Sequence, residues 1–269
     1  MERWCLIIDS KEKSEKQKSE RLGKSIYNKF GSKLTITEYN RYSDITIRFD
    51  NGYELKHRDY SCFKNTCRSP YCKTVYGHGY IGEGKYKTGY ADATHTKQYT
   101  CWRSMIQRCY SEKYHKKKPT YKDCEVCEEW LNFQNFAKWY DENYYQIDNE
   151  QMSLDKDILH KGNKIYSPDN CVFVDNRINS LFTKSNKVRG DTPIGVKHNG
   201  NKFTSMCSII KDNIPKDIHI GTFNTPEEAF YAYKQFKEKY IKQVADFYKD
   251  KIPNKLYNAM YNYEVEITD

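Results

Sequence analysis

Long apolar runs are absent from this sequence, and none approaches the roughly 20 residues that a membrane-spanning helix needs. Residues 1–8 are too short a run, and wrongly flanked, for a secretory signal peptide. The ten cysteines are not spaced like the disulfide framework of a small secreted protein. These absences predict a reduced, cytoplasmic protein with no membrane partner.

The apolar content is also low, at 38% of 269 residues, so the hydrophobic core must be modest. The 25 tyrosines compensate, because a tyrosine buries its ring while its hydroxyl stays in contact with water. The formal net charge is +9. A basic chain favours an acidic partner, and nucleic acid is the commonest one.

The pattern along the chain predicts an α+β fold of several domains. Residues 1–30 form a charged arm or helix, and residues 31–90 form a small β-unit followed by a linker rich in glycine and tyrosine. Residues 91–188 contain helices and then a strand–loop–strand–helix segment. Residues 189–269 form a separate C-terminal module.

Strands of the β-unit are indicated by alternation of apolar and polar residues over 34–38, 44–49 and 53–56. The residues between the last two segments, Asp50-Asn51-Gly52, are a strong hairpin signal.

Helices in the centre of the chain are indicated by apolar residues at helical spacing over 97–110 and 127–140. Between them, residues 111–120 (SEKYHKKKPT) predict a basic loop that Pro119 interrupts.

The C-terminal module has the pattern of three short strands and a long helix. The expected strands are 194–197, 203–210 and 218–223. Asn199-Gly200 is a two-residue turn between the first two. Thr225 at the N-cap, Pro226 at the first helical position and Glu228 at the third predict where the helix starts.

This module resembles the Apetala/ethylene-response-factor (ERF) family of DNA-binding domains. The likeness rests on Gly195-Val196, Lys202-Phe203, the run IGTFNTPEEA at 220–229 and Ala232-Tyr233. The resemblance implies a partner, double-stranded DNA, whose major groove receives the three-stranded sheet while the helix braces the back of the sheet. Carried over by position, the implied DNA-binding residues are Lys197, Asn199, Lys202, Thr204 and Lys211.

The sheet departs from that family, which favours several arginines and a tryptophan there. This chain has Lys197, His198 and Phe203 instead. Lysine makes good phosphate contacts but poorer two-pronged contacts to bases, so we expect more affinity than sequence discrimination from this module.

The segment 154–182, LDKDILHKGNKIYSPDNCVFVDNRINSLF, resembles the HNH, or His-Me finger, nucleases in its strand–loop–strand–helix plan. The resemblance implies that Asp155 and Asn179 hold Mg²⁺ (or Mn²⁺) against a scissile phosphate and that Asn170 braces the loop. Carboxylate and amide oxygens are the ligands that such hard cations prefer.

A wider likeness rests on residues spread along the chain: Tyr99, Trp102, Met105, Arg108-Cys109-Tyr110, Pro119-Thr120-Tyr121, Trp130, Phe133, Phe136, Trp139-Tyr140 and Leu154-Asp155-Lys156-Asp157. In these residues the larger arrangement resembles phage-encoded proteins of the homing-endonuclease type, in which an HNH-like unit precedes an ERF-type domain. This likeness covers most of the chain after about residue 30.

The sequence differs from the nuclease family at the general base, because Lys156 stands where that family has histidine. A protonated amine cannot accept a proton from water, and lysine is protonated at neutral pH unless burial lowers its pKa. Three alternatives remain open. In the first, Lys156 is desolvated and neutral and serves as the base. In the second, Asp157 or His160 serves as the base, and in the third there is no catalysis and Lys156 binds phosphate.

Zinc is not expected as a structural cofactor. Cys124 and Cys127 have the spacing of half a zinc site, and Cys62, Cys67 and Cys72 cluster earlier, but the chain has only one Cys-x-x-Cys pair.

Three functional hypotheses follow. The first is a metal-dependent DNA endonuclease of the HNH type. The second is a catalytically silent DNA-binding protein, a regulator or DNA-occupying factor, on the same scaffold. The third is a module that acts on a host or phage protein.

Overall fold

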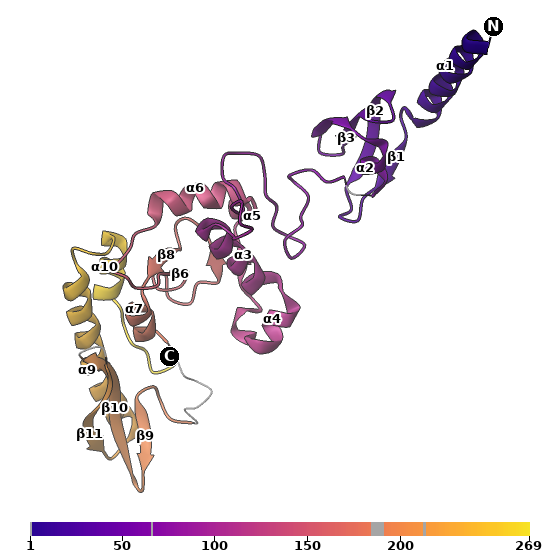
Figure 1. Cartoon of the computed structure of the whole chain (residues 1–269). Helices are drawn as coiled ribbons and strands as arrows, with labels where there is room; N and C mark the ends of the chain where they lie inside the picture. Colours follow the sequence, from indigo (N-terminus) through magenta and orange to yellow (C-terminus); the bar gives the residue numbers. More distant parts are fainter. Residues whose placement is uncertain (1, 66, 184–190, 212–213) are drawn as a thin grey trace. The chain divides into compact units, whose positions relative to one another are not determined.

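The computed structural model describes residues 2–65, 67–183, 191–211 and 214–269, and the chain divides into two compact units, Met1–Lys138 and Trp139–Asp269. Helices and several small antiparallel sheets make up both units, so the predicted mixture of α and β structure is confirmed (Figure 1). Within the described residues, no helix is both long and apolar enough to cross a membrane.

The first unit begins with a helix and a four-stranded antiparallel sheet of order β1-β2-β3-β4. These elements are α1 (Glu2–Arg21), β1 (Ser25–Tyr27), β2 (Lys33–Arg41), β3 (Asp44–Phe49), β4 (Glu54–Arg58) and α2 (Tyr60–Asn65). Gly52 has a φ of 85° in the turn between β3 and β4, where the sequence predicts a hairpin. Leu34, Ile36, Ile45 and Ile47 are fully buried, as the alternating pattern requires.

From Lys97 onward the first unit is mostly helical. It contains α3 (Lys97–Tyr110), α4 (Glu112–Lys117), the 3₁₀ turn η1 (Pro119–Tyr121), β5 (Glu125–Val126) and α5 (Glu128–Leu131), and α6 (Phe133–Asn143) continues into the second unit. The buried indole of Trp102 on α3 donates a hydrogen bond of 2.7 Å to the carbonyl of Trp130 on α5. The aromatic residues at helical spacing therefore face one another across this core.

Two sequence predictions for this region were wrong. The single helix predicted over 127–140 is divided at Asn132, because Tyr80 accepts a backbone hydrogen bond from Phe133 and donates one to Leu131, and so holds the chain extended. The basic segment 111–120 is not a loop. Ser111 caps the N-terminus of α4 by accepting a hydrogen bond from the backbone of Tyr114, and this local cap outweighs the many like charges.

The second unit contains the strand–loop–strand–helix segment and the C-terminal module. Its elements are β6 (Ser153–Asp155), β7 (Ile165–Tyr166), β8 (Val172–Val174), α7 (Asn176–Leu181), β9 (Val196–Asn199), β10 (Lys202–Lys211), β11 (Ile214–Phe223), α9 (Pro226–Tyr248) and α10 (Asn254–Tyr261). Strand β6 pairs antiparallel with β8, and the C-terminal sheet has the order β11-β10-β9.

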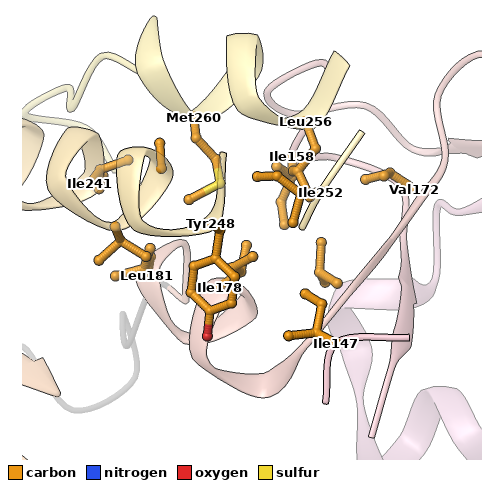
Figure 2. Packing of buried hydrophobic residues seen from close by; sticks show 13 residues of the cluster. Ile147, Ile158, Val172, Ile178, Leu181, Ile241, Tyr248, Ile252, Leu256 and Met260 are labelled. Carbon is orange, nitrogen blue, oxygen red and sulfur yellow. The ribbon is translucent and has the colours of Figure 1, made fainter. Parts of the chain in front are cut away.

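One hydrophobic core joins these parts of the second unit. Figure 2 shows Ile178 of α7, Ile241 and Tyr248 of α9, and Leu256 and Met260 of α10 pointing into the same cluster. The other half of α9 packs against the C-terminal sheet through Ala229, Phe230 and Tyr233. Helix α9 starts as predicted, since Thr225 accepts from the backbone of Glu228 and Glu228 accepts from the backbone of Asn224.

Gly195 provides a test of this packing. Its φ is 76°, and a Cβ there would lie 2.1 Å from the Cδ2 atom of Tyr233. We predict that Gly195→Ala costs about 2–5 kcal/mol of unfolding free energy, from backbone strain and the displaced ring together. Gly200 is the matched control, because its φ is 59° and nothing lies within 4 Å of a Cβ there. Urea unfolding should show a clearly smaller cost for Gly200→Ala, and equal costs would contradict this account.

Candidate functional site

Four of the predicted DNA-binding residues lie on one face of the C-terminal sheet. Lys202 is directly opposite Asn199, and Thr204 is directly opposite Lys197. Side chains two residues apart on a strand point to the same side, so these four side chains share one face. Val196, by contrast, belongs to the core that packs against α9. The shared face is therefore the one that points away from α9, and we call it the outer face.

The outer face is polar and carries few charges. The Asn199 side-chain amide donates a 3.1 Å hydrogen bond to the hydroxyl of Thr204, which is itself only 9% exposed. Thr204 thus orients Asn199 and offers little surface of its own. Lys197 and Lys202 are exposed. Lys211 ends β10, but its side chain lies outside the described residues.

Two residues that sequence reasoning missed also lie on the outer face. Thr222 is directly opposite Thr204, and His219 is directly opposite Met206. The His219 imidazole lies 3.3 Å from the Thr222 hydroxyl. The register shift between Ser205 and Met206 brings His219 to this face, and strand alternation alone does not reveal such a shift.

The second candidate site is the segment β6–β8–α7. Asp155 ends β6 and pairs with Val172 at the start of β8, and α7 follows β8 directly. Asp175 caps α7 by accepting a 2.7 Å hydrogen bond from the backbone of Ile178. The segment thus runs strand, loop, strand and helix, with β7 inside the loop.

The Asp155 carboxyl group holds the turn that follows β6. Its Oδ1 atom accepts hydrogen bonds of 2.9 Å from the backbone N–H groups of Asp157 and Ile158. Burial raises the pKa of Asp155 to about 6, and the nearby Asp157 carboxylate contributes in the same direction. Asp155 is therefore ionised at neutral pH but protonated in mild acid.

Lys156 is turned into the loop and away from solvent. The residue is 8% exposed, and its amine donates a 3.1 Å hydrogen bond to the carbonyl of Asn163 and contacts the Asp157 carboxylate at 3.3 Å. The Tyr166 ring centroid lies 5.9 Å from the same amine. An amine that donates to a carbonyl and pairs with a carboxylate is poorly placed to accept a proton from water.

A network of amides braces the loop between β6 and β8. Asn163 donates hydrogen bonds to the carbonyls of Lys156 (2.7 Å) and Ile165 (2.8 Å), and its own side-chain oxygen accepts one from Asn170 (3.2 Å). Asn170 thus takes part in the network through its side-chain amide. Asn163 is more central, and sequence reasoning missed it, although its position after Gly162 (φ 80°) is typical of a structured turn.

The remaining candidates are accessible but separate. The Asp157 side chain is 49% exposed. His160 is exposed and lines a groove of about 500 Å³ beside α10, together with Asn258 and Asn262. Asn179 is partly buried on α7, and within the described residues no hydrogen bond joins it to Asp155.

The donor chemistry of this segment suits Mg²⁺ or Mn²⁺, since Asp155, Asp157 and Asn179 offer carboxylate and amide oxygens. One oxygen of Asp155 is engaged by backbone N–H groups, which leaves the other for a cation. In the parts of the chain that the structure describes, no group of three or more His, Cys, Asp and Glu side chains forms a metal site.

Comparisons of the chain with models of protein families, with curated proteins and with solved structures find no match. The function is therefore inferred from the geometry of the two candidate sites.

The raised pKa of Asp155 predicts a pH-dependent stability difference. The folded-state pKa of about 6 lies above the ordinary value of 3.8, so Asp155 favours the folded state most when protonated and this contribution is lost as pH rises from about 4 to 6. Asp155→Asn keeps a side-chain oxygen for the two N–H groups but cannot ionise. We expect its stability, measured relative to the unchanged protein, to be higher at pH 7.5 than at pH 4.

Urea unfolding at the two pH values measures this difference, with Asp250→Asn at an exposed position as the control. A relative stability of Asp155→Asn that does not change with pH would contradict the assignment.

Proposed function

We propose that this chain binds double-stranded DNA, with the outer face of β9–β10–β11 against the duplex. The observation that carries the proposal is the register that gathers Lys197, Asn199 and Lys202 on this face, away from α9. Strands fit into the major groove, where side chains on one face of a sheet reach base edges. The net charge of +9 supports a polyanionic partner.

The residues of the outer face have different roles in this proposal. The amines of Lys197 and Lys202 contact phosphates, since ammonium groups are compact point charges. Asn199, held by Thr204, keeps one amide hydrogen and its carbonyl oxygen for a base edge. His219 and Thr222 add a second pair of hydrogen-bonding groups. Because only two described lysines lie on the outer face, the sheet contributes more to the orientation of the protein on the duplex than to the affinity.

The first test removes the two lysines. Lys197→Gln with Lys202→Gln should weaken duplex binding by roughly tenfold per lysine at about 0.1 M salt, because each lost phosphate contact removes about 0.9 units of the log–log salt slope. Fluorescence anisotropy with a labelled duplex measures the affinity. The control is Lys216→Gln with Lys239→Gln, which removes the same charge from positions off the outer face. Lys216 lies opposite the inward-facing Ile209, and Lys239 is exposed on α9.

Equal losses in the two double variants would exclude the outer face as the DNA-binding surface. If the unchanged protein shifts no duplex even at low salt, DNA binding fails, and the hypothesis of a module that acts on another protein takes its place.

We propose as a second function that the β6–β8–α7 segment hydrolyses DNA phosphodiester bonds. The observation that favours it is Asp155, a carboxyl group of raised pKa placed at the end of β6 next to Asp157. Asp155 and Asn179 would hold Mg²⁺ or Mn²⁺, which when bound stabilises charge on the leaving oxygen. Of the proposed bases, Asp157 and His160 are accessible to water, whereas Lys156 is committed to the loop.

The second test is nicking of supercoiled plasmid with and without Mg²⁺ or Mn²⁺. Asp155→Asn should abolish metal-dependent nicking while the affinity for duplex stays within about twofold. Replacing the base, by Asp157→Asn or His160→Ala, should lower the rate by roughly 10²–10⁴-fold. Asp250→Asn is the matched control.

No nicking by the unchanged protein, with salt-sensitive duplex binding retained, would contradict the nuclease proposal. The chain would then be a DNA-binding protein on a silent ββα scaffold.

A further inference from the structure

The strongest concentration of charge in the chain lies outside both candidate sites. The segment 108–122, RCYSEKYHKKKPTYK, has six Lys and Arg residues and one Glu, which gives a net charge of +5 (6 − 1) in 15 residues. The whole chain has a net charge of +9. This segment, which spans the end of α3, α4 and η1 with the residues that flank them, therefore carries more than half of the net charge.

The lysines of this segment are exposed, and among the described residues they have no acidic partners. Lys113, Lys116, Lys117, Lys118 and Lys122 are all exposed, and in the part of the chain that the structure describes none of their amines is in a salt bridge. We call these five residues the α4 surface.

Helix geometry makes this arrangement locally unfavourable. Lys113, Lys116 and Lys117 are spaced i, i+3 and i+4, so their side chains are neighbours on one face of α4, and each like-charge pair costs a few tenths of a kcal/mol. The helix dipole offsets part of this cost, since it stabilises cations in the last turn by about 0.3–1 kcal/mol. It does not explain Lys113 in the first turn, nor Lys118 and Lys122 beyond the helix.

The α4 surface is held in a fixed shape. His115 lies with its Nε2 atom 2.8 Å from the carbonyl of Arg108, which links α4 back to α3. Tyr114 packs edge to face on Tyr121 at 5.7 Å, and the Arg108 guanidinium lies 5.9 Å from the centroid of the Tyr121 ring. Ordered cations lose less conformational entropy on binding than cations on a flexible tail.

We infer that the α4 surface binds the phosphate backbone of DNA and supplies more phosphate contacts than the C-terminal sheet. The inference rests on the proposed DNA binding and adds a second surface in the other unit of the chain. The α4 surface has five lysines, whereas the outer face has two. Lysine amines suit contacts with phosphate that do not depend on sequence.

An anionic membrane is the other polyanion that such a surface could bind, but the features of the α4 surface favour DNA. Helices that lie on membranes bury an apolar face among the lipids. The sequence of α4, EKYHKK, has one aromatic ring, Tyr114, and that ring packs against Tyr121.

The test is a matched pair of quadruple variants. The first changes Lys113, Lys116, Lys117 and Lys118 to Gln. The control changes Lys16, Lys18, Lys24 and Lys33 to Gln, which removes the same charge from exposed positions elsewhere in the first unit. The affinity of each full-length protein for a random-sequence duplex is measured from 50 to 300 mM salt, and circular dichroism verifies folding.

We expect the α4 variant to lower the log–log salt slope by about 3 to 4 units, at about 0.9 per lost contact, and the control by less than one. Equal changes in the two variants would overturn the inference. The inference would also be overturned if the unchanged protein bound anionic phosphatidylserine vesicles and its binding to DNA did not depend on the α4 surface.

The outcomes separate this inference from the proposed function. If the α4 variant keeps the full slope while Lys197→Gln with Lys202→Gln loses binding, the sheet binds DNA and the α4 surface does not. If the unchanged protein binds no duplex, both proposals fail together.

Discussion

Both candidate sites depend on the burial of one helix. The first half of α9 packs under the C-terminal sheet through Phe230 and Tyr233, and its second half enters the core of the ββα segment through Ile241 and Val244. Full burial of each such side chain stabilises the folded state by about 1.5–3 kcal/mol, so separating the helix from the sheet or from the ββα core would cost several kcal/mol. Within the second unit, the outer face of the sheet and the loop that carries Asp155 are therefore fixed to one rigid element.

The loop between β6 and β8 limits the chemistry of the ββα segment. Lys156 stands at the position to which the nuclease resemblance assigns a histidine, yet its amine is bonded to Asn163 and Asp157, and Asn163 is bonded in turn to Asn170. Removing the lysine would leave the partly buried carbonyl of Asn163 without this donor and Asp157 without its ion-pair partner. This explains Lys156 by its structural role, without catalysis. Any hydrolysis must then use the more exposed Asp157 or His160.

Sequence reasoning succeeded where the determinants are local. The capping box at Thr225 and Glu228, the hairpin turn at Gly52 and the alternation of β2 and β3 each depend on neighbours a few residues apart. It failed where distant residues decide. Asn132 breaks a regular helical pattern because Tyr80, some fifty residues earlier, bonds the backbone on both sides of it.

The same distinction applies within the candidate sites. Lys197, Asn199, Lys202 and Thr204 share a face by simple alternation, so position along a strand was enough to group them. His219 reaches that face only through a register shift, and Asn163 matters only because the loop closes around it. Helix α4 is an exception to this distinction, since its cap at Ser111 is local, but a run of lysines has the same composition in a solvated loop and in a capped helix.

In the proposed DNA binding, the distribution of charge gives the two units different roles. Contacts from ammonium groups to phosphate weaken with salt and carry no sequence information, whereas amide and hydroxyl contacts to base edges depend little on salt. The α4 surface has only groups of the first kind, and the outer face combines two lysines with Asn199, Thr222 and His219. Affinity should therefore come mainly from α4 and discrimination from the sheet. With lysine rather than arginine on the sheet, that discrimination is carried by Asn199 and its neighbours, which makes a loosely read site the physical expectation.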